Sequence, residues 1–213
     1  MMESSANLIL LLVILLNFFI LGSSRLGACI RTAALQGSML AFVPVLMHPI
    51  SGHSLFLAVS ALGLKGIFMP WLLFRAIRQV QIRREIEPMI GYVPTLILGT
   101  MATAGAFIFS DHLPLVKAHH GSLVIPAGLA TLAAGFLMLI TRRKALTQAL
   151  GYLIFENGVF IFGILLTEAM PLMVEAGVLL DLLVAIFVMG IVVNQINREF
   201  SSMNVENLSS LRE

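Results

Sequence analysis

The sequence contains very little cysteine: Cys29 is the only one among 213 residues. A single cysteine cannot close an internal disulfide, and it cannot supply the several thiolates that hold an iron–sulfur cluster. The sequence also lacks the glycine-rich loop of phosphate-binding proteins and the Ser, His and Asp grouping of hydrolases. We therefore expect no cofactor, no metal ion and no redox centre in this chain, and we interpret Cys29 as a small packing residue.

Charged residues are the second scarce class. They make up 11% of the chain, against 59% hydrophobic residues and a mean hydropathy of +0.99. A soluble domain has about 25% charged residues, so this composition excludes a soluble globular protein. We expect an integral membrane protein whose partners are the lipid bilayer and other membrane subunits, and we expect no nucleic-acid partner.

Apolar runs of about 20 residues, the length that crosses a hydrocarbon layer of about 30 Å, occur seven times. The first run lacks both a basic region before it and a convincing cleavage site, so we expect a retained helix and not a signal peptide. The sequence predicts an all-α integral membrane protein with seven transmembrane helices. The predicted spans are residues 6–22, 32–48, 54–77, 89–110, 121–141, 145–167 and 172–195.

Lysine and arginine are almost confined to the loops on one side of these predicted helices. Eleven of the 13 basic residues follow the first, third, fifth and seventh helices, whereas Lys117 lies on the other side and Lys65 lies inside a helix. Because basic loops stay in the cytoplasm, we expect the N-terminus outside and the C-terminus in the cytoplasm. The eleven residues are Arg25, Arg31, Arg75, Arg78, Arg83, Arg84, Arg142, Arg143, Lys144, Arg198 and Arg212.

Three ionisable residues stand near the middle of predicted helices: Lys65, Glu156 and Asp181. At a rise of about 1.5 Å per residue each lies roughly 14–17 Å into its helix, so all three share one layer near the bilayer midplane. A charge at that depth costs about 2.5–3.5 kcal/mol on insertion scales, and such residues usually serve the movement of protons or ions. We predict that these three side chains form a proton or ion path.

Two interpretations of the charged layer remain open. In the first, Lys65 pairs with one acid, and the ion pair only pins two helices together. In the second, which we favour, the charges relay protons. One lysine can neutralise only one of the two acids, so the other acid has no opposite charge within this chain's layer. Burial favours the protonated form of such a carboxyl group, and a buried lysine loses its charge more readily than an arginine. Gln36, Gln148 and Asn157 are predicted to line the path, with a hydrogen bond between helices as the simpler alternative.

Four segments of the chain together resemble hydrogenase-4 component E, a family of membrane subunits of formate-hydrogenlyase-type complexes. The segments are GLKGIFMPW (63–71), RRKALTQALGYLIFENG (142–158), VEAGVLLD (174–181) and NVENLSSLRE (204–213). The C-terminal half of that family is similar to the K subunit of respiratory complex I and to the C subunit of multisubunit Na+/H+ antiporters. By that resemblance Glu156 and Asp181 match the membrane acids of the K subunit, each displaced by about one helix turn.

The resemblance implies a non-catalytic subunit of an energy-converting NiFe hydrogenase or formate hydrogenlyase complex in the prokaryotic cytoplasmic membrane. A peripheral hydrogenase arm would carry the electrons, antiporter-like membrane subunits would be the direct neighbours, and this chain would contribute part of a proton or Na+ path. The alternatives are a structural spacer of the same complex and a stand-alone ion transporter. The transporter is disfavoured because the sequence lacks broken paired helices and inverted symmetry.

The domain organisation that we expect follows the same pattern. Residues 1–88 form an N-terminal three-helix unit, and residues 89–120 form a linking helix with an outer loop. Residues 121–200 form a C-terminal three-helix unit like the K subunit. Residues 201–213 form a short amphipathic tail on the cytoplasmic surface.

Overall fold

The computed structural model is all-helical over the residues that it describes, which are 2–47, 52–80, 89–112, 122–166 and 190. Helices are the expected result, because a segment in lipid must satisfy its backbone hydrogen bonds internally. The elements are α1 (Met2–Gly22), α2 (Leu26–Met47), α3 (Gly52–Ala61), the π-helical segment η1 (Leu62–Phe68), α4 (Met69–Val80), α5 (Tyr92–Asp111), α6 (Val124–Thr141) and α7 (Ala145–Leu166).

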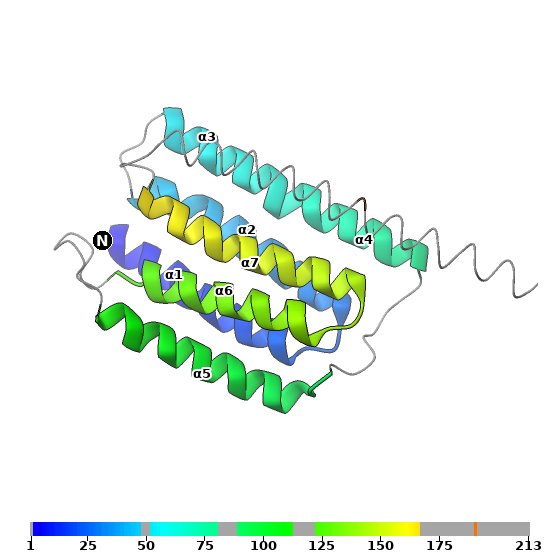
Figure 1. Ribbon diagram of the computed structural model, residues 1–213. Coiled ribbons are helices and arrows are strands. Elements are labelled where there is room, and N and C mark those ends of the chain that lie inside the picture. Colours follow the sequence, from blue (N-terminus) through cyan, green and yellow to red (C-terminus); the bar gives the residue numbers. More distant parts are fainter. Residues whose placement is uncertain (1, 48–51, 81–88, 113–121, 167–189, 191–213) are drawn as a thin grey trace, which may run out of the picture.

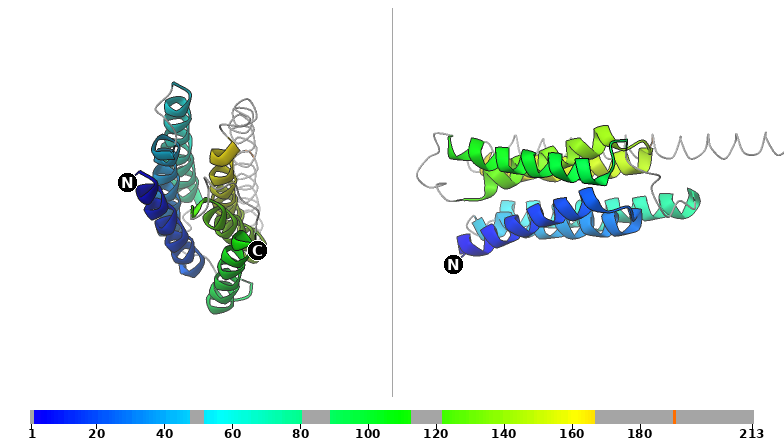
Figure 2. Two further views of the ribbon diagram at one scale, coloured as in Figure 1. Left: turned by 90° about the vertical axis from the view of Figure 1, so that its left-hand side faces the viewer. Right: turned by 90° about the horizontal axis from the view of Figure 1, so that it is seen from below.

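The helices run roughly along one direction and form two layers (Figures 1 and 2). One layer contains α1, α2 and the continuous rod made by α3, η1 and α4, and the other contains α5, α6 and α7. Helix α2 lies between α1 and the rod, and α6 lies between α5 and α7. Contacts of α1 with α6 and of α2 with α7 join the layers. These two interfaces therefore enclose the centre of the bundle.

Six helical stretches of the described residues are long and apolar enough to cross a membrane. They coincide with the first six predicted spans, which confirms the prediction of an all-α, multi-pass membrane protein for that part of the chain. The seventh predicted span, 172–195, and the predicted tail, 201–213, lie outside the described residues. The orientation in the membrane and the domain boundaries remain predictions.

One helix boundary was predicted wrongly. The second span was expected at residues 32–48, but α2 begins at Leu26, so Arg31 lies in the helix and not in the loop before it. The intervening residues are apolar or small and continue the helix without interruption. Arg31 is exposed, and a long arginine side chain on a helix surface can extend toward the headgroups while its stem stays on apolar surface.

One end of the bundle carries most of the described basic residues, in its turns and in the last part of α4, and we call this the basic end. Arg25 lies in the turn between α1 and α2, Arg142 and Arg143 lie in the turn between α6 and α7, and Arg75 lies near the end of α4. The two turns lie at the same end of the molecule in Figure 1. Because successive helices run in opposite directions, the basic residues that follow every second helix lie at the same end of the bundle.

Two separate apolar clusters form the core, one toward each end of the bundle. The basic-end cluster contains the buried residues Ile20, Leu21, Leu26, Cys29, Ile30, Ala33, Leu73, Ala134, Met138, Leu146, Ala149, Leu150 and Ile154. The far-end cluster contains Ala6, Leu10, Val13, Ile14, Leu40, Ala41, Val43, Ala61, Ala106, Val124, Ala127, Ala130, Phe160, Ile161 and Ile164. Cys29 is a buried packing residue, as predicted.

Helices α6 and α7 approach each other closely at Gly135. A Cβ atom added to Gly135 would collide with the backbone nitrogen and Cα of Phe155. Small residues permit such close approach of helices in a membrane, where packing between backbones replaces the hydrophobic effect as a driving force. Because Phe155 immediately precedes Glu156, this contact fixes the height of Glu156 in the bundle.

Candidate functional site

A layer of buried polar side chains separates the two apolar clusters. We call it the polar layer, and it comprises Asn17 on α1, Gln36 on α2, Lys65 on η1, Thr131 on α6, and Glu156 and Asn157 on α7. Each of these residues is at least 91% buried. Five helical elements thus contribute polar atoms at the same depth, although polar groups at that depth cost free energy unless they are paired.

Lys65 and Glu156 form the charged part of the layer. Lys65 Nζ lies 3.7 Å from Glu156 Oε1 and donates a hydrogen bond of 3.3 Å to the backbone carbonyl of Glu156. The Lys65 ammonium group also stands 4.9 Å above the centre of the Phe160 ring, where a cation–π attraction contributes. The pair therefore bridges the rod of the first layer and α7 of the second.

The segment that carries Lys65 departs from a regular α-helix. Residues Leu62–Phe68 form a π-helix, and the N–H of Met69 donates to the carbonyl of Leu64, five residues earlier. The sequence predicted a helical span over residues 54–77, without a π-helical segment in it. Single π-turns inside α-helices are rare and occur frequently at functional sites.

Gly37 on α2 allows η1 to approach closely at the position of Lys65. A Cβ atom added to Gly37 would lie 2.9 Å from Lys65 Cβ and 3.4 Å from the Lys65 carbonyl oxygen. The backbone at Lys65 is therefore held against α2, and the lysine side chain extends from there to α7. A residue with a side chain at position 37 would displace the starting point of the lysine.

The uncharged part of the layer is a continuous hydrogen-bond network across four helices. Asn157 Nδ2 donates to Gln36 Oε1 at 3.3 Å, and Gln36 Nε2 donates to Asn17 Oδ1 at 2.8 Å. Asn17 Nδ2 donates to Thr131 Oγ1 at 2.9 Å, and Thr131 Oγ1 donates to the carbonyl of Ala127 at 2.7 Å. Gln36 Nε2 also lies 3.3 Å from the carbonyl of Val13. Since Asn157 follows Glu156 directly, the network and the ion pair are contiguous.

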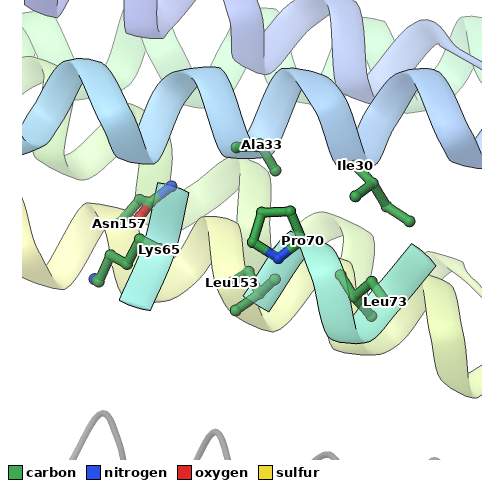
Figure 3. A pocket seen from close by; sticks show the side chains of 8 residues that line it. Ile30, Ala33, Lys65, Pro70, Leu73, Leu153 and Asn157 are labelled. Atoms are coloured by element: carbon green, nitrogen blue, oxygen red, sulfur yellow. The ribbon is translucent and has the colours of Figure 1, made fainter. Parts of the chain in front are cut away.

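A small cavity lies beside the ion pair, between α2, the rod and α7. The space in which a water-sized molecule fits amounts to about 10 Å³. Lys65 and Asn157 lie at one end of it, Ile30 and Leu73 lie at the other, and Pro70 lies between them (Figure 3). The remaining lining residues are Ala33, Ala34 and Leu153.

The other predicted site residues lie apart from the layer or outside the described chain. Gln148 is exposed at the start of α7, and its Nε2 donates to the carbonyl of Arg142 at 3.0 Å, so it closes the turn between α6 and α7. Asp181 lies outside the described residues. The structure therefore joins Lys65 to Glu156 and Gln36 to Asn157, and it does not bring Gln148 to them.

Sequence reasoning missed Asn17, Thr131 and Phe160 as members of the site. Asn17 carried a usable signal, because an asparagine in the middle of an apolar span needs a partner in lipid. Thr131 carried none, since threonine commonly satisfies its hydroxyl on its own helix. Phe160 is one of 14 phenylalanines, and only the fold shows that its ring faces Lys65.

The arrangement is suited to proton transfer and offers little else chemically. It holds one carboxylate, one ammonium group and several hydrogen-bonding side chains in a buried interior, where each group can exchange a proton or orient a neighbour. The described part of the polar layer has no thiolate and no imidazole. Its two opposite charges lie 3.7 Å apart, so the pair carries little net charge in the membrane.

Comparison with known proteins gives two informative similarities. The chain is 31% identical over 206 residues to the uncharacterized protein Rv0085 of Mycobacterium tuberculosis, which covers 94% of this chain and 93% of that protein. It is 26% identical over 157 residues to hydrogenase-4 component E of Escherichia coli K12, which covers 73% of this chain and 72% of that protein, and the protein of the same name in Shigella flexneri matches equally. No family model matches the chain. No solved structure matches it either.

Proposed function

This chain belongs to the same protein family as the uncharacterized protein Rv0085 of Mycobacterium tuberculosis, and we propose that it is a membrane subunit of a hydrogenase-type complex. The distant similarity to hydrogenase-4 component E, over 73% of the chain, supports this assignment. In the proposal, redox chemistry takes place in a peripheral arm, and antiporter-like membrane subunits are the neighbours. The chain itself contributes part of a proton path, with Na+ as the alternative ion.

The observation that carries the proposal is the buried Lys65–Glu156 pair within the polar layer. The two side chains are 8% and 5% exposed, and they lie between two apolar clusters, in the middle of the spans. Such residues are expensive in a membrane and generally face a pathway. The state with both groups neutral differs from the ion pair only by the transfer of one proton. That proton can cross the 3.7 Å between Lys65 Nζ and Glu156 Oε1 when the side chains close to hydrogen-bonding distance or when one water lies between them.

Three further parts of the proposal rest on the sequence and on its resemblance to hydrogenase-4 component E. Asp181 is the third ionisable residue of the path, the C-terminal part of the chain corresponds to the K subunit of complex I, and the basic end faces the cytoplasm of a prokaryotic cell. Asp181 stands outside the described residues, so the proposal rests on Lys65 and Glu156.

Replacement of Glu156 by glutamine in the assembled complex tests the proposal. The Glu156→Gln variant keeps the size and a hydrogen-bonding carbonyl but cannot release a proton. We expect the complex to assemble, as judged by blue-native gels, and the hydrogenase arm to react with an artificial electron donor, while ion pumping in membrane vesicles is lost. Asp111→Asn is the matched control, because Asp111 is an exposed acid at the end of α5 and outside the polar layer. Normal pumping by Glu156→Gln would refute the proton-path role.

The second candidate function is a structural spacer, and the bridge between the two layers favours it. Lys65 and Glu156 join the rod to α7, and an ion pair with that position can serve only to hold helices together. In that case Glu156→Gln reduces pumping only in proportion to the loss of assembled complex. A stand-alone transporter is the remaining alternative, and ion transport by the purified chain in liposomes would support it.

A further inference from the structure

The cavity beside Lys65 extends from the polar layer toward the basic end of the bundle. At its outer end Ile30 lies five residues after Arg25, and Leu73 lies two residues before Arg75. Both belong to the basic-end cluster and are 1% exposed. Figure 3 shows Lys65 and Asn157 at the opposite end. The cavity therefore lies on the basic-end side of the charged pair, between that pair and the nearest basic loops.

The size and lining of the cavity fit one water molecule. A water needs roughly 10–15 Å³ of such space and two to four polar partners, and the space here is about 10 Å³. Asn157 is 3% exposed, and its Nδ2 donates to Gln36, so its side-chain oxygen Oδ1 is the atom that can accept from a water. Lys65 supplies N–H donors at the same end. Pro70 has no N–H, so it donates nothing to the carbonyl groups of the preceding turn, and a water can donate to them instead.

We propose that this cavity is a water site that connects the Lys65–Glu156 pair with the aqueous phase at the basic end. The inference rests on the proposed function, because it supplies the proton path with its access route on that side. The water accepts a proton from the Lys65 ammonium group and releases one toward the basic end. Glu156 then takes a proton from the far side of the path and passes it to the neutral amine, which restores the ion pair. The same steps in reverse carry a proton inward.

Ile30 and Leu73 close the site toward the basic end. No polar atom of these side chains can hold a second water, so exchange requires that the two side chains move apart. The route is therefore narrow and opens only intermittently, which prevents a continuous leak of ions through the apolar cluster.

Cysteine accessibility tests the water site without relying on transport. The natural Cys29 is first replaced by alanine, and Ala33→Cys, which lines the cavity, is compared with Ala130→Cys. Both alanines are buried, since Ala130 is 3% exposed and Ala33 is 6% exposed, but Ala130 lies in the far-end cluster. The complete complex in sealed vesicles of either orientation is exposed to silver ions, which are small enough to follow water. The thiols that remain are counted after denaturation by maleimide labelling of the subunit.

We expect Ala33→Cys to react roughly tenfold faster than Ala130→Cys, and only from the basic-end side, because the thiolate is the reactive form and apolar burial suppresses it. Adding Leu73→Ala should raise the rate at Ala33→Cys further. Equal rates at the two positions, or reaction from the other side, would overturn the inference.

The proposed function and the water site fail separately. If Ala33→Cys is unreactive while Glu156→Gln abolishes pumping, the proton path stands and the access route lies elsewhere. If Ala33→Cys reacts as expected while Glu156→Gln pumps normally, the cavity holds water but the pair is not a proton path.

Discussion

Lys65 Nζ contacts Glu156 twice, at 3.7 Å from the carboxylate Oε1 and at 3.3 Å from the backbone carbonyl of the same residue. The second contact does not depend on the glutamate side chain. Lys65 is therefore held against α7 even when Glu156 accepts a proton, and the pair can change its protonation state without separating the helices.

Our first prediction concerns single and double replacement of this pair. Removing one partner leaves a buried charge, so Lys65→Met or Glu156→Leu alone should destabilise the assembled complex by about 3–5 kcal/mol. The double variant should regain most of that stability, because buried ion pairs are often replaceable by apolar side chains of similar volume. Thermal unfolding in detergent measures the effect. A double variant that assembles without pumping supports the proton path, and one that pumps leaves only the structural role.

A second prediction concerns the uncharged network. Thr131→Val keeps the shape of the side chain but removes the acceptor for Asn17 and the donor to Ala127. The buried amide of Asn17 then loses a partner, and we expect a loss of about 1–3 kcal/mol in thermal unfolding. Thr32→Val is the control, since Thr32 is also buried but donates only to the carbonyl of Ala28 on its own helix. Equal losses in both variants would mean that the link to Asn17 contributes nothing.

A third prediction concerns the contact between α6 and α7. Gly135→Ala places a Cβ against the backbone of Phe155, and the helices must separate, at a cost of about 1–3 kcal/mol. Gly105→Ala on α5 is the control, because a Cβ there meets no atom within 4 Å. We expect Gly135→Ala to lower the unfolding temperature, and we expect Gly105→Ala to leave it unchanged or to raise it slightly. Identical unfolding curves for the two variants would contradict the packing that positions Glu156.

A fourth prediction concerns the position of Lys65. Gly37→Ala brings a methyl group to 2.9 Å from Lys65 Cβ, so η1 must move away from α2. A shift that raises the barrier to proton transfer by about 1.4 kcal/mol lowers the rate of transfer roughly tenfold. Gly63→Ala, on the same π-helical segment, meets nothing within 4 Å and should pump at the normal rate. The ratio of ions moved to hydrogen formed measures both variants, and a normal ratio for Gly37→Ala would exclude a positional role for this contact.

The distribution of apolar residues alone determined that this chain is a bundle of membrane helices. Six predicted spans match the described helices, because lipid leaves a run of about 20 apolar residues no other way to satisfy its backbone. The depth of Lys65 and Glu156 was also readable, since position along a helix gives depth directly. The start of α2 was misplaced at residue 32, because an arginine in the chain was taken to end the apolar run, whereas Arg31 reaches outward from the helix.

Only the tertiary structure decided which of these residues meet. Rotation of each helix about its axis, and the close approaches at Gly37 and Gly135, bring Lys65 to Glu156 and turn Gln36 and Asn157 toward each other. The same rotations leave Gln148 exposed at the start of α7. The pattern of apolar residues in lipid constrains rotation weakly, because lipid and protein interior are equally apolar, and packing between helices makes the choice.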